Sequence, residues 1–397
     1  MAKKKAAKKK KKSVVKPDER LSFSERKKIA RQMVNDSKRK GDGRLGFASD
    51  IPDVDYVSTG IEALDQLTGS YSEGDQPTYL GFGGIPRGRY VILWGPQGVG
   101  KSTLCDRIIA NAQRQNLLAM LIDAENRRTK PWMRRQGIDL NSLIWHRGGI
   151  LEDSLQDLIN LLQVVDFIAV DTLHALAPKA ELWDANKVER QMTDDAPLGR
   201  QAFGLGKFFR IATARVAKAG VGCLLIGQAR NLISTTKAAL TCVGGHALQH
   251  YATHRIRVSR LMSKEKVPRK NVYSPDGRRE QVPVGFVQKL LLEKSGTNHL
   301  EGRAVEVPFL NNRGPDDFKS NLMTAVAMGV IKAAGAWFEI PTSSGEPIRV
   351  QGRAKLLEFM NDNQEYYEWI MAKIGESYKP EVEEQHEPEE VPDAEEV

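Results

Sequence analysis

A glycine-rich loop in the first third of the chain has the residue types and spacing that hold nucleotide phosphates. Gly95, Gly100, Lys101 and Ser102 fit the pattern G-x-x-x-x-G-K-[ST], directly after the apolar run 90–94. Glycines let successive N–H groups point at phosphate oxygens, the lysine reaches the β- and γ-phosphates, and the serine hydroxyl binds Mg²⁺. An ordinary glycine loop explains neither the lysine nor the serine. The predicted nucleotide-binding residues here are Gly95, Pro96, Gln97, Gly98, Val99, Gly100, Lys101, Ser102 and Thr103.

Carboxylates at the ends of two further apolar runs could complete a hydrolytic site. Asp171 ends the run FIAVD, and Mg²⁺ bound through water needs a carboxylate on a strand beside the phosphate loop. Glu125 follows the run LLAMLID, at a strand's C-terminal end, where α/β active sites lie. Hydrolysis needs such a carboxylate to orient and polarise the attacking water. Each residue could also be an ordinary strand-end carboxylate.

Apolar runs that alternate with helical segments must position these groups. This alternation predicts an α/β fold with a mostly parallel central sheet flanked by helices, over residues 54–312. The break Asn-Asn-Arg-Gly-Pro precedes a small C-terminal α/β domain, residues 313–375, in which the stretches 322–340 and 356–374 have helical patterns. The expected strands are residues 90–94, 117–123, 167–171 and 222–227.

The two ends of the chain carry opposite charge. Residues 1–50 hold 18 Lys/Arg against 6 Asp/Glu, whereas residues 376–397 hold 10 acids against one lysine. We expect residues 1–20 and 376–397 to be disordered, the former as a solvated tail or as an arm that binds phosphate backbones. Residues 21–53 are expected to form an N-terminal helix, capped by Ser24, and a linker.

Composition favours a cytoplasmic location. The three cysteines are widely spaced and form no C-x-x-C pair, which fits a reducing compartment. The lysine-rich N-terminus has no apolar segment behind it, and no run approaches the ~18 apolar residues of a membrane span. Neither secretion nor membrane insertion is predicted.

Several motifs together resemble those of the RecA recombinases, over roughly residues 40–375. The motifs STG…LD and G-x-x-x-x-G-K-[ST] alone are shared with DnaB-type helicases, RadA and KaiC-like ATPases. The combination of DAE, ALAPKAE, GQ and GG-x-AL-x-x-YA is more specific. In chain order the matching stretches are STGIEALDQLTG, GGIPRG, GPQGVGKST, LIDAEN, VDTLHALAPKAE, GQARN, GGHALQHYATHRIRV and AGAWF.

The resemblance assigns roles to individual residues. It implies that Glu125 activates water, that Asp171 lies on the Mg²⁺ side, and that Gln228 senses the γ-phosphate. An amide suits that task because it can donate to or accept from a phosphate oxygen. Trp132 would stack on adenine, although it could equally be a core residue, and Lys294 would reach the ATP of a neighbouring subunit.

The resemblance also implies two irregular DNA-binding loops, residues 180–199 and 229–245. Long loops within a compact domain are usually functional or disordered. Apolar side chains at the tips of these loops would separate base triplets of the DNA, and arginines would lie near the DNA phosphates. The implied DNA-binding residues are Leu198, Gly199, Arg210, Arg230, Ile233, Gly244 and Gly245.

The sequence departs from the family pattern at the expected subunit contact. His250 stands in place of a phenylalanine, Gln249 in place of a lysine, and Gly296 in place of a second lysine beside Lys294. Together with insertions near residues 70–82 and 264–285, these departures indicate a divergent member, compatible with a bacteriophage origin.

The resemblance implies a Mg²⁺-dependent and DNA-dependent ATPase. Such a protein would form helical filaments on single-stranded DNA by head-to-tail self-assembly, then pair that DNA with homologous duplex DNA and promote strand exchange. The alternatives are a hexameric helicase, a RadA-like branch-migration ATPase, and a DNA-coating protein without enzymatic activity.

Overall fold

The computed structural model describes residues 22–39, 45–51, 53–71, 81, 83–184, 186–191, 199–232, 239–242, 245–261, 267–273, 278–342 and 345–376. The chain divides into two compact units, Met1–Asp53 and Val54–Val397. The predicted tails lie outside the described residues, apart from Glu376 at the end of the last helix. No described helix is long and apolar enough to cross a membrane.

The described part of the first unit consists mainly of helix α1 (Phe23–Arg39), followed by a short 3-10 turn, Ala48–Asp50. The helix begins earlier than the sequence predicted, because Ser22 and Glu25 hydrogen bond reciprocally. The Ser22 Oγ accepts from the Glu25 N–H at 3.3 Å, and the Ser22 N–H donates to Glu25 Oε2 at 2.9 Å. This arrangement is a capping box, so Ser24 is not the cap.

A ten-stranded mixed sheet forms the centre of the second unit, in the order β14-β13-β12-β9-β3-β7-β6-β4-β5, with β8 paired to β7. Neighbours from β9 to β5 pair parallel, whereas β8, β12, β13 and β14 join antiparallel. The predicted α/β class with a mostly parallel sheet is confirmed. The strands are β3 (Tyr90–Gly95), β4 (Ala119–Asp123), β5 (Leu143–His146), β6 (Phe167–Asp171), β7 (Gly222–Leu232), β8 (Ala239–Cys242), β9 (His254–Leu261), β12 (Gly285–Lys294), β13 (Ala304–Leu310) and β14 (Gly314–Pro315).

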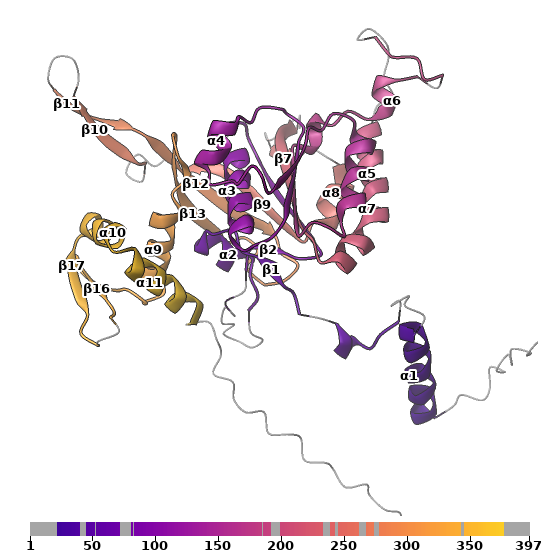
Figure 1. Cartoon of the computed structure of the whole chain (residues 1–397), viewed down its shortest axis with the longest axis horizontal. Helices are drawn as coiled ribbons and strands as arrows, with labels where there is room; N and C mark the ends of the chain where they lie inside the picture. Colours follow the sequence, from indigo (N-terminus) through magenta and orange to yellow (C-terminus); the bar gives the residue numbers. More distant parts are fainter. Residues whose placement is uncertain are drawn as a thin grey trace, which may run out of the picture. The chain divides into compact units, whose positions relative to one another are not determined.

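Helices cover both faces of this sheet, which explains why its central strands are apolar throughout. Leu93 of β3 packs in one cluster with α3, while its neighbour Ile92 packs in a second cluster with α5 and α7. Successive strand residues point to opposite faces, so both must be apolar. Figure 1 shows α5 and α7 together on one side of the sheet. The helices are α2 (Glu62–Thr68), α3 (Lys101–Arg114), α4 (Lys130–Arg135), α5 (Leu151–Leu161), α6 (Lys179–Leu182), α7 (Arg200–Ala219) and α8 (Gly245–Tyr251).

Two small antiparallel pairs complete the core region. Strands β1 (Tyr56–Val57) and β2 (Ile85–Pro86) pair beside α2. Strands β10 (Arg269–Tyr273) and β11 (Arg279–Pro283) pair as an arm that extends away from the sheet (Figure 1). This arm lies within the insertion predicted near residues 264–285.

The C-terminal segment has its own apolar cluster, which includes Leu322, Phe338, Leu356 and Ile370. The predicted helical pattern over residues 322–340 is only partly right. Helix α9 (Asp317–Ala327) ends before Gly329, whose φ of +77° breaks the helix, and strands follow. The separate cluster supports a small α/β domain at residues 313–375, and its boundary stays a prediction. The remaining elements are β15 (Lys332–Ala334), β16 (Trp337–Ile340), β17 (Ile348–Gln351), α10 (Arg353–Asp362) and α11 (Gln364–Glu376).

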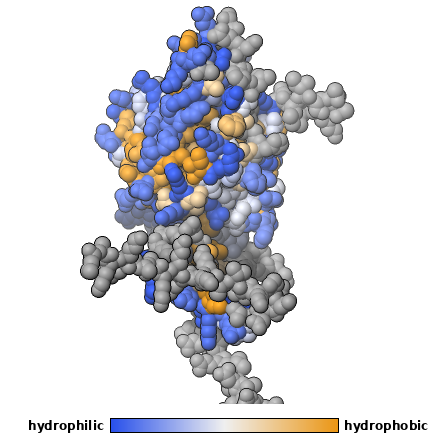
Figure 2. Space-filling view, turned by 90° about the vertical axis from the view of Figure 1, so that its right-hand side faces the viewer, coloured by the Kyte–Doolittle hydropathy of each residue, from blue (hydrophilic) through white to orange (hydrophobic). Residues whose placement is uncertain are grey.

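The side of the core that carries α5 and α7 has apolar surface. Figure 2 looks onto that side and shows hydrophobic residues gathered between hydrophilic ones. On α7 itself, Phe203 is 63% exposed and Ile211 is 43% exposed.

Candidate functional site

The predicted phosphate loop connects β3 to α3, as the motif requires. Gly95 ends β3, Gly100 adopts φ +84° before the first helical turn, and α3 begins at Lys101. The unpaired N–H groups at the start of α3 therefore lie at the loop, where they favour an anion. Ser102 is exposed in the first turn of the helix. The remaining predicted phosphate-binding residues, Pro96, Gln97, Gly98, Val99 and Thr103, lie in the same loop and turn.

The Lys101 ammonium group lies against the loop that it is expected to serve. It donates to the carbonyl oxygens of Gly95 at 2.8 Å and Pro96 at 2.6 Å. Burial lowers the pKa of Lys101, while the charges of Asp171 and Glu125 oppose that shift. The lysine is thus held near both predicted carboxylates. A phosphate oxygen could replace the two carbonyl oxygens as acceptor of its hydrogen bonds.

The predicted water-activating carboxylate and the predicted sensor are in direct contact. The Gln228 Nε2 donates to Glu125 Oε1 at 2.8 Å, although the two residues are 103 positions apart. Thr172 Oγ1 also donates to Oε1 at 3.4 Å, and Arg127 lies 3.2 Å from Oε2. Residues that follow the ends of β4 and β6, together with Gln228 within β7, therefore converge on one carboxylate.

Asp171 lies at the end of β6, opposite Asp123 at the end of β4. Its peptide bond to Thr172 is cis. Asp171 is 2% exposed, and its Oδ1 has no hydrogen-bond partner among the described residues. A buried carboxylate oxygen with spare acceptor capacity, on a strand that packs against α3, fits Mg²⁺, which binds through one or two side chains, waters and substrate phosphates. The donor set at this site thus fits the metal that the motif implies.

Arg128 is a site residue that the sequence reasoning missed. Its buried guanidinium contacts Asp171, Asp123 and Asp106, the last on α3. Burial raises the pKa of Asp106 to about 6, although Arg128 opposes that rise. A lone aspartate three residues before Ile109, on the buried side of α3, was the available sequence signal. A buried aspartate needs a hydrogen-bond donor or a cation, and this need was the only hint of a partner such as Arg128.

Trp132 lies on α4, in the segment that follows Glu125. Thr129 caps this helix by accepting from the Trp132 N–H at 3.4 Å. The indole is half-buried, and the Arg135 guanidinium carbon lies 6.0 Å from the ring centroid. The ring is therefore partly exposed and not a fully buried core residue. Stacking on adenine stays a prediction.

Lys294 is hydrogen bonded to α8, not to the phosphate loop of its own chain. Its ammonium donates to the backbone carbonyls of Gln249 at 3.2 Å and His250 at 2.9 Å. Burial lowers the pKa of Lys294, and Arg255 lowers it further. Two of the residues that differ from the family pattern, Gln249 and His250, therefore lie against Lys294.

The second predicted DNA loop is less irregular than its sequence indicated. Strand β7 continues to Leu232 and pairs with β8 from Ala229↔Cys242 to Leu232↔Ala239. Residues 229–232 have no local strand pattern, and the hydrogen bonds that order them come from the partner strand β8. The sequence therefore predicted a loop here. Arg230 is exposed on β7, and Gly245 begins α8. Ile233 and Gly244 lie outside the described residues.

The first predicted DNA loop is described only in part. It includes α6 and an isolated bridge between Trp183 and Glu189. Gly199, with φ +77°, precedes the first turn of α7, and Arg210 is exposed on that helix. Leu198 lies outside the described residues, so its predicted place at the loop tip is not described.

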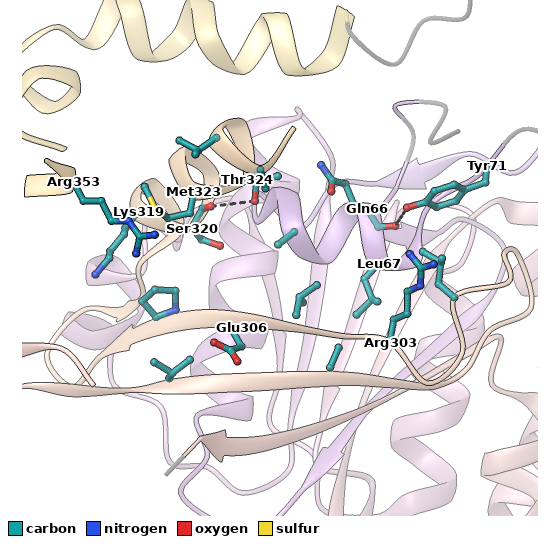
Figure 3. A pocket seen from close by; sticks show the side chains of 18 residues that line it. Gln66, Leu67, Tyr71, Arg303, Glu306, Lys319, Ser320, Met323, Thr324 and Arg353 are labelled. Carbon is teal, nitrogen blue, oxygen red and sulfur yellow. Dashed lines mark hydrogen bonds between the residues drawn. The ribbon is translucent and has the colours of Figure 1, made fainter. Parts of the chain in front are cut away.

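A cavity of about 910 Å³ lies away from the phosphate loop, between α2, β13 and α9 (Figure 3). Val287 and Pro308, which pair across β12 and β13, line it. The next residues along these strands, Gln288 and Phe309, instead border Gly100. Because successive strand residues face opposite ways, the cavity and the phosphate loop lie on opposite faces of this ladder.

Comparison with known proteins agrees with this geometry. A family model described as the RecA N-terminal domain matches residues 29–278. Protein RecA of Thermus thermophilus is 32% identical over 358 residues, which cover 89% of this chain and 95% of the relative. Protein RecA of Bifidobacterium breve is 31% identical over 82% of this chain and 74% of its own length. Protein RecA of Roseiflexus castenholzii is 30% identical over 86% of this chain and 88% of its own length. The chain therefore belongs to the RecA family.

Proposed function

We propose that this protein is a Mg²⁺- and DNA-dependent ATPase that forms filaments on single-stranded DNA and promotes homologous pairing and strand exchange. The observation that carries the proposal is the 2.8 Å hydrogen bond from Gln228 to Glu125. It links the predicted hydrolytic carboxylate to the first residue that leads into the β7–β8 hairpin, the expected DNA-binding element.

Hydrolysis would use residues that already converge on one place. The α3 N-terminus and Lys101 hold the phosphates, and Glu125 orients the attacking water and accepts its proton. Bound Mg²⁺ would neutralise charge on the phosphates, with Ser102 and Asp171 as its protein-side partners. To act as base, the Glu125 carboxylate must exchange its bond to Gln228 for a bond to water.

Coupling to DNA follows from the position of Gln228. A γ-phosphate that takes over the Gln228 amide would free Glu125 and shift the start of the hairpin, where Arg230 is exposed. Loss of the phosphate on hydrolysis would reverse this shift. The hairpin would therefore have one position, and the protein one affinity for DNA, with ATP bound, and both would change after hydrolysis.

Filament assembly is proposed from the family and from the position of Lys294. The ammonium of Lys294 lies at α8 and can act on a neighbouring subunit's nucleotide if subunits associate head to tail. Heterologous contacts of this kind, when they do not close, generate helical filaments.

The test is ATPase activity with and without single-stranded DNA, measured beside negative-stain images of the same samples. We expect DNA-stimulated hydrolysis and filaments. Glu125→Gln should keep ATP and DNA binding but slow hydrolysis by about 10²-fold or more. The matched control is Glu358→Gln, an exposed position on α10, which should leave the rate unchanged. Near-normal turnover of Glu125→Gln would remove this residue from the role of base.

The same samples separate the alternative functions. A hexameric helicase would show rings and unwind forked duplexes, and a RadA-like enzyme would drive branch migration without filaments. A DNA-coating protein would bind DNA with no ATPase activity.

A further inference from the structure

The Arg128 guanidinium has three carboxylate partners. Its Nε lies 2.7 Å from Asp106 Oδ1, its Nη1 3.0 Å from Asp123 Oδ1, and its Nη2 2.7 Å from Asp171 Oδ2. The Arg128 side chain is 6% exposed, and those of its partners are 1% or 2% exposed. Charge-assisted bonds at these distances in a buried place are strong and directional.

These three bonds tie together the elements that form the nucleotide site. Asp106 belongs to α3, which begins at the phosphate loop, while Asp123 and Asp171 end neighbouring strands. Arg128 itself lies in the loop between Glu125 and Trp132. One guanidinium therefore fixes the helix, both strand ends and this loop relative to one another.

The bonds also determine which carboxylate oxygens are left over. Arg128 engages Oδ2 of Asp171 and Oδ1 of Asp123. Asp171 Oδ1 and Asp123 Oδ2 are buried without a hydrogen-bond partner among the described residues. A carboxylate held by one oxygen has a fixed orientation for the other, which is how outer partners orient metal-binding groups.

We propose that Arg128 is a positioning residue for ATP hydrolysis: it holds Asp171 by Oδ2 so that Oδ1 faces the hydrated Mg²⁺, and it anchors the loop that carries Glu125. This inference rests on the proposed ATPase function. It concerns orientation, because the guanidinium need not touch ATP or the metal.

Arg128→Lys separates charge from geometry. Lysine keeps the positive charge but offers a single nitrogen, which cannot span three carboxylates in the planar arrangement of a guanidinium. We expect the Mg²⁺ concentration for half-maximal binding of a fluorescent ATP analogue to rise about tenfold or more. The kcat should fall by a similar factor, with KM for ATP at saturating Mg²⁺ changed less than about threefold.

A second variant covers the case in which Arg128→Lys does not fold. The triple variant Asp106→Leu, Asp123→Asn and Arg128→Met replaces the buried ionic cluster by neutral side chains, and it leaves Asp171 beside the charge of Lys101. Replacing a whole buried ion cluster by neutral groups of similar size is a change that proteins often tolerate. The triple variant also removes the Asp171 partner, so the Mg²⁺ midpoint should rise as in Arg128→Lys.

Arg107→Met is the matched control. Arg107 is a neighbouring buried arginine on α3, but it faces Asp317, at 3.9 Å, and the Arg313 carbonyl. Its loss should lower the thermal midpoint without moving the Mg²⁺ midpoint. A purely structural role for Arg128 would give this same result.

The outcomes distinguish the two proposals. A Mg²⁺ midpoint unchanged within about twofold in folded Arg128 variants overturns the positioning role and leaves the ATPase proposal intact. A lower midpoint also overturns it, because Arg128 would then compete with Mg²⁺. If the unmodified protein binds the analogue at no Mg²⁺ concentration, both proposals fail.

Discussion

Gly100→Ala tests how tightly the phosphate loop is packed. Gly100 has φ +84°, a conformation that costs an alanine about 1–2 kcal/mol. Its added Cβ would lie 2.6 Å from Phe309 Cε2 and 2.7 Å from Gln288 Nε2. Neither neighbour moves freely, since Phe309 stacks on Phe286 at 4.5 Å and Gln288 donates to the Val99 carbonyl at 2.5 Å. Overpacking of this kind adds about 1–3 kcal/mol. We expect a total loss of ~2–5 kcal/mol in the free energy of unfolding.

Gly98→Ala in the same loop isolates the steric part of this loss. Gly98 has φ +71°, but the nearest neighbour of its Cβ would be Arg260 Nη2 at 4.0 Å. This variant should lose only the conformational part, about 1–2 kcal/mol. Urea denaturation without nucleotide measures both losses. Equal losses in the two variants would refute the packing argument.

Three further predictions concern pH, salt and Mg²⁺. Burial lowers the pKa of His254 to about 4 from 6.5, so its folded form binds fewer protons than the unfolded chain between these values. Stability should therefore fall as pH drops from 6.5 to about 4, by up to ~3 kcal/mol, and urea unfolding of His254→Gln should show a weaker dependence. Deleting residues 2–12 removes eight lysines, and if these contact DNA, the slope of log affinity against log salt becomes shallower; an unchanged slope would favour a solvated tail. Removing residues 379–397 should strengthen duplex DNA binding at low Mg²⁺ more than at high Mg²⁺, because this polyanion competes electrostatically with DNA; equal affinities at both levels would contradict that competition.

The sequence predicted those elements whose signals are local. Strand β6 (Phe167–Asp171) matches its predicted range, because a strand buried on both faces is a continuous apolar run. The Gly-Lys-Ser motif also placed the loop between β3 and α3, because the residues that form this loop are adjacent in the sequence. Contacts between distant segments had no such signal. No local pattern marked Arg128, because only the fold brings three aspartates around it. The 229–232 ladder likewise depends on a partner strand.

The segment from Gln228 to Tyr251 contains the proposed sensor, the β7–β8 hairpin and α8 in chain order. Its far end supplies the carbonyls that hold Lys294. Lys101 and Asp171 lie outside it. The parts that would transmit the nucleotide signal are thus encoded as one contiguous segment, which meets the hydrolytic residues through the bond from Gln228 to Glu125. An exchange of this segment between relatives would move Gln228, the β7–β8 hairpin and α8 together and would leave Lys101, Glu125 and Asp171 in place.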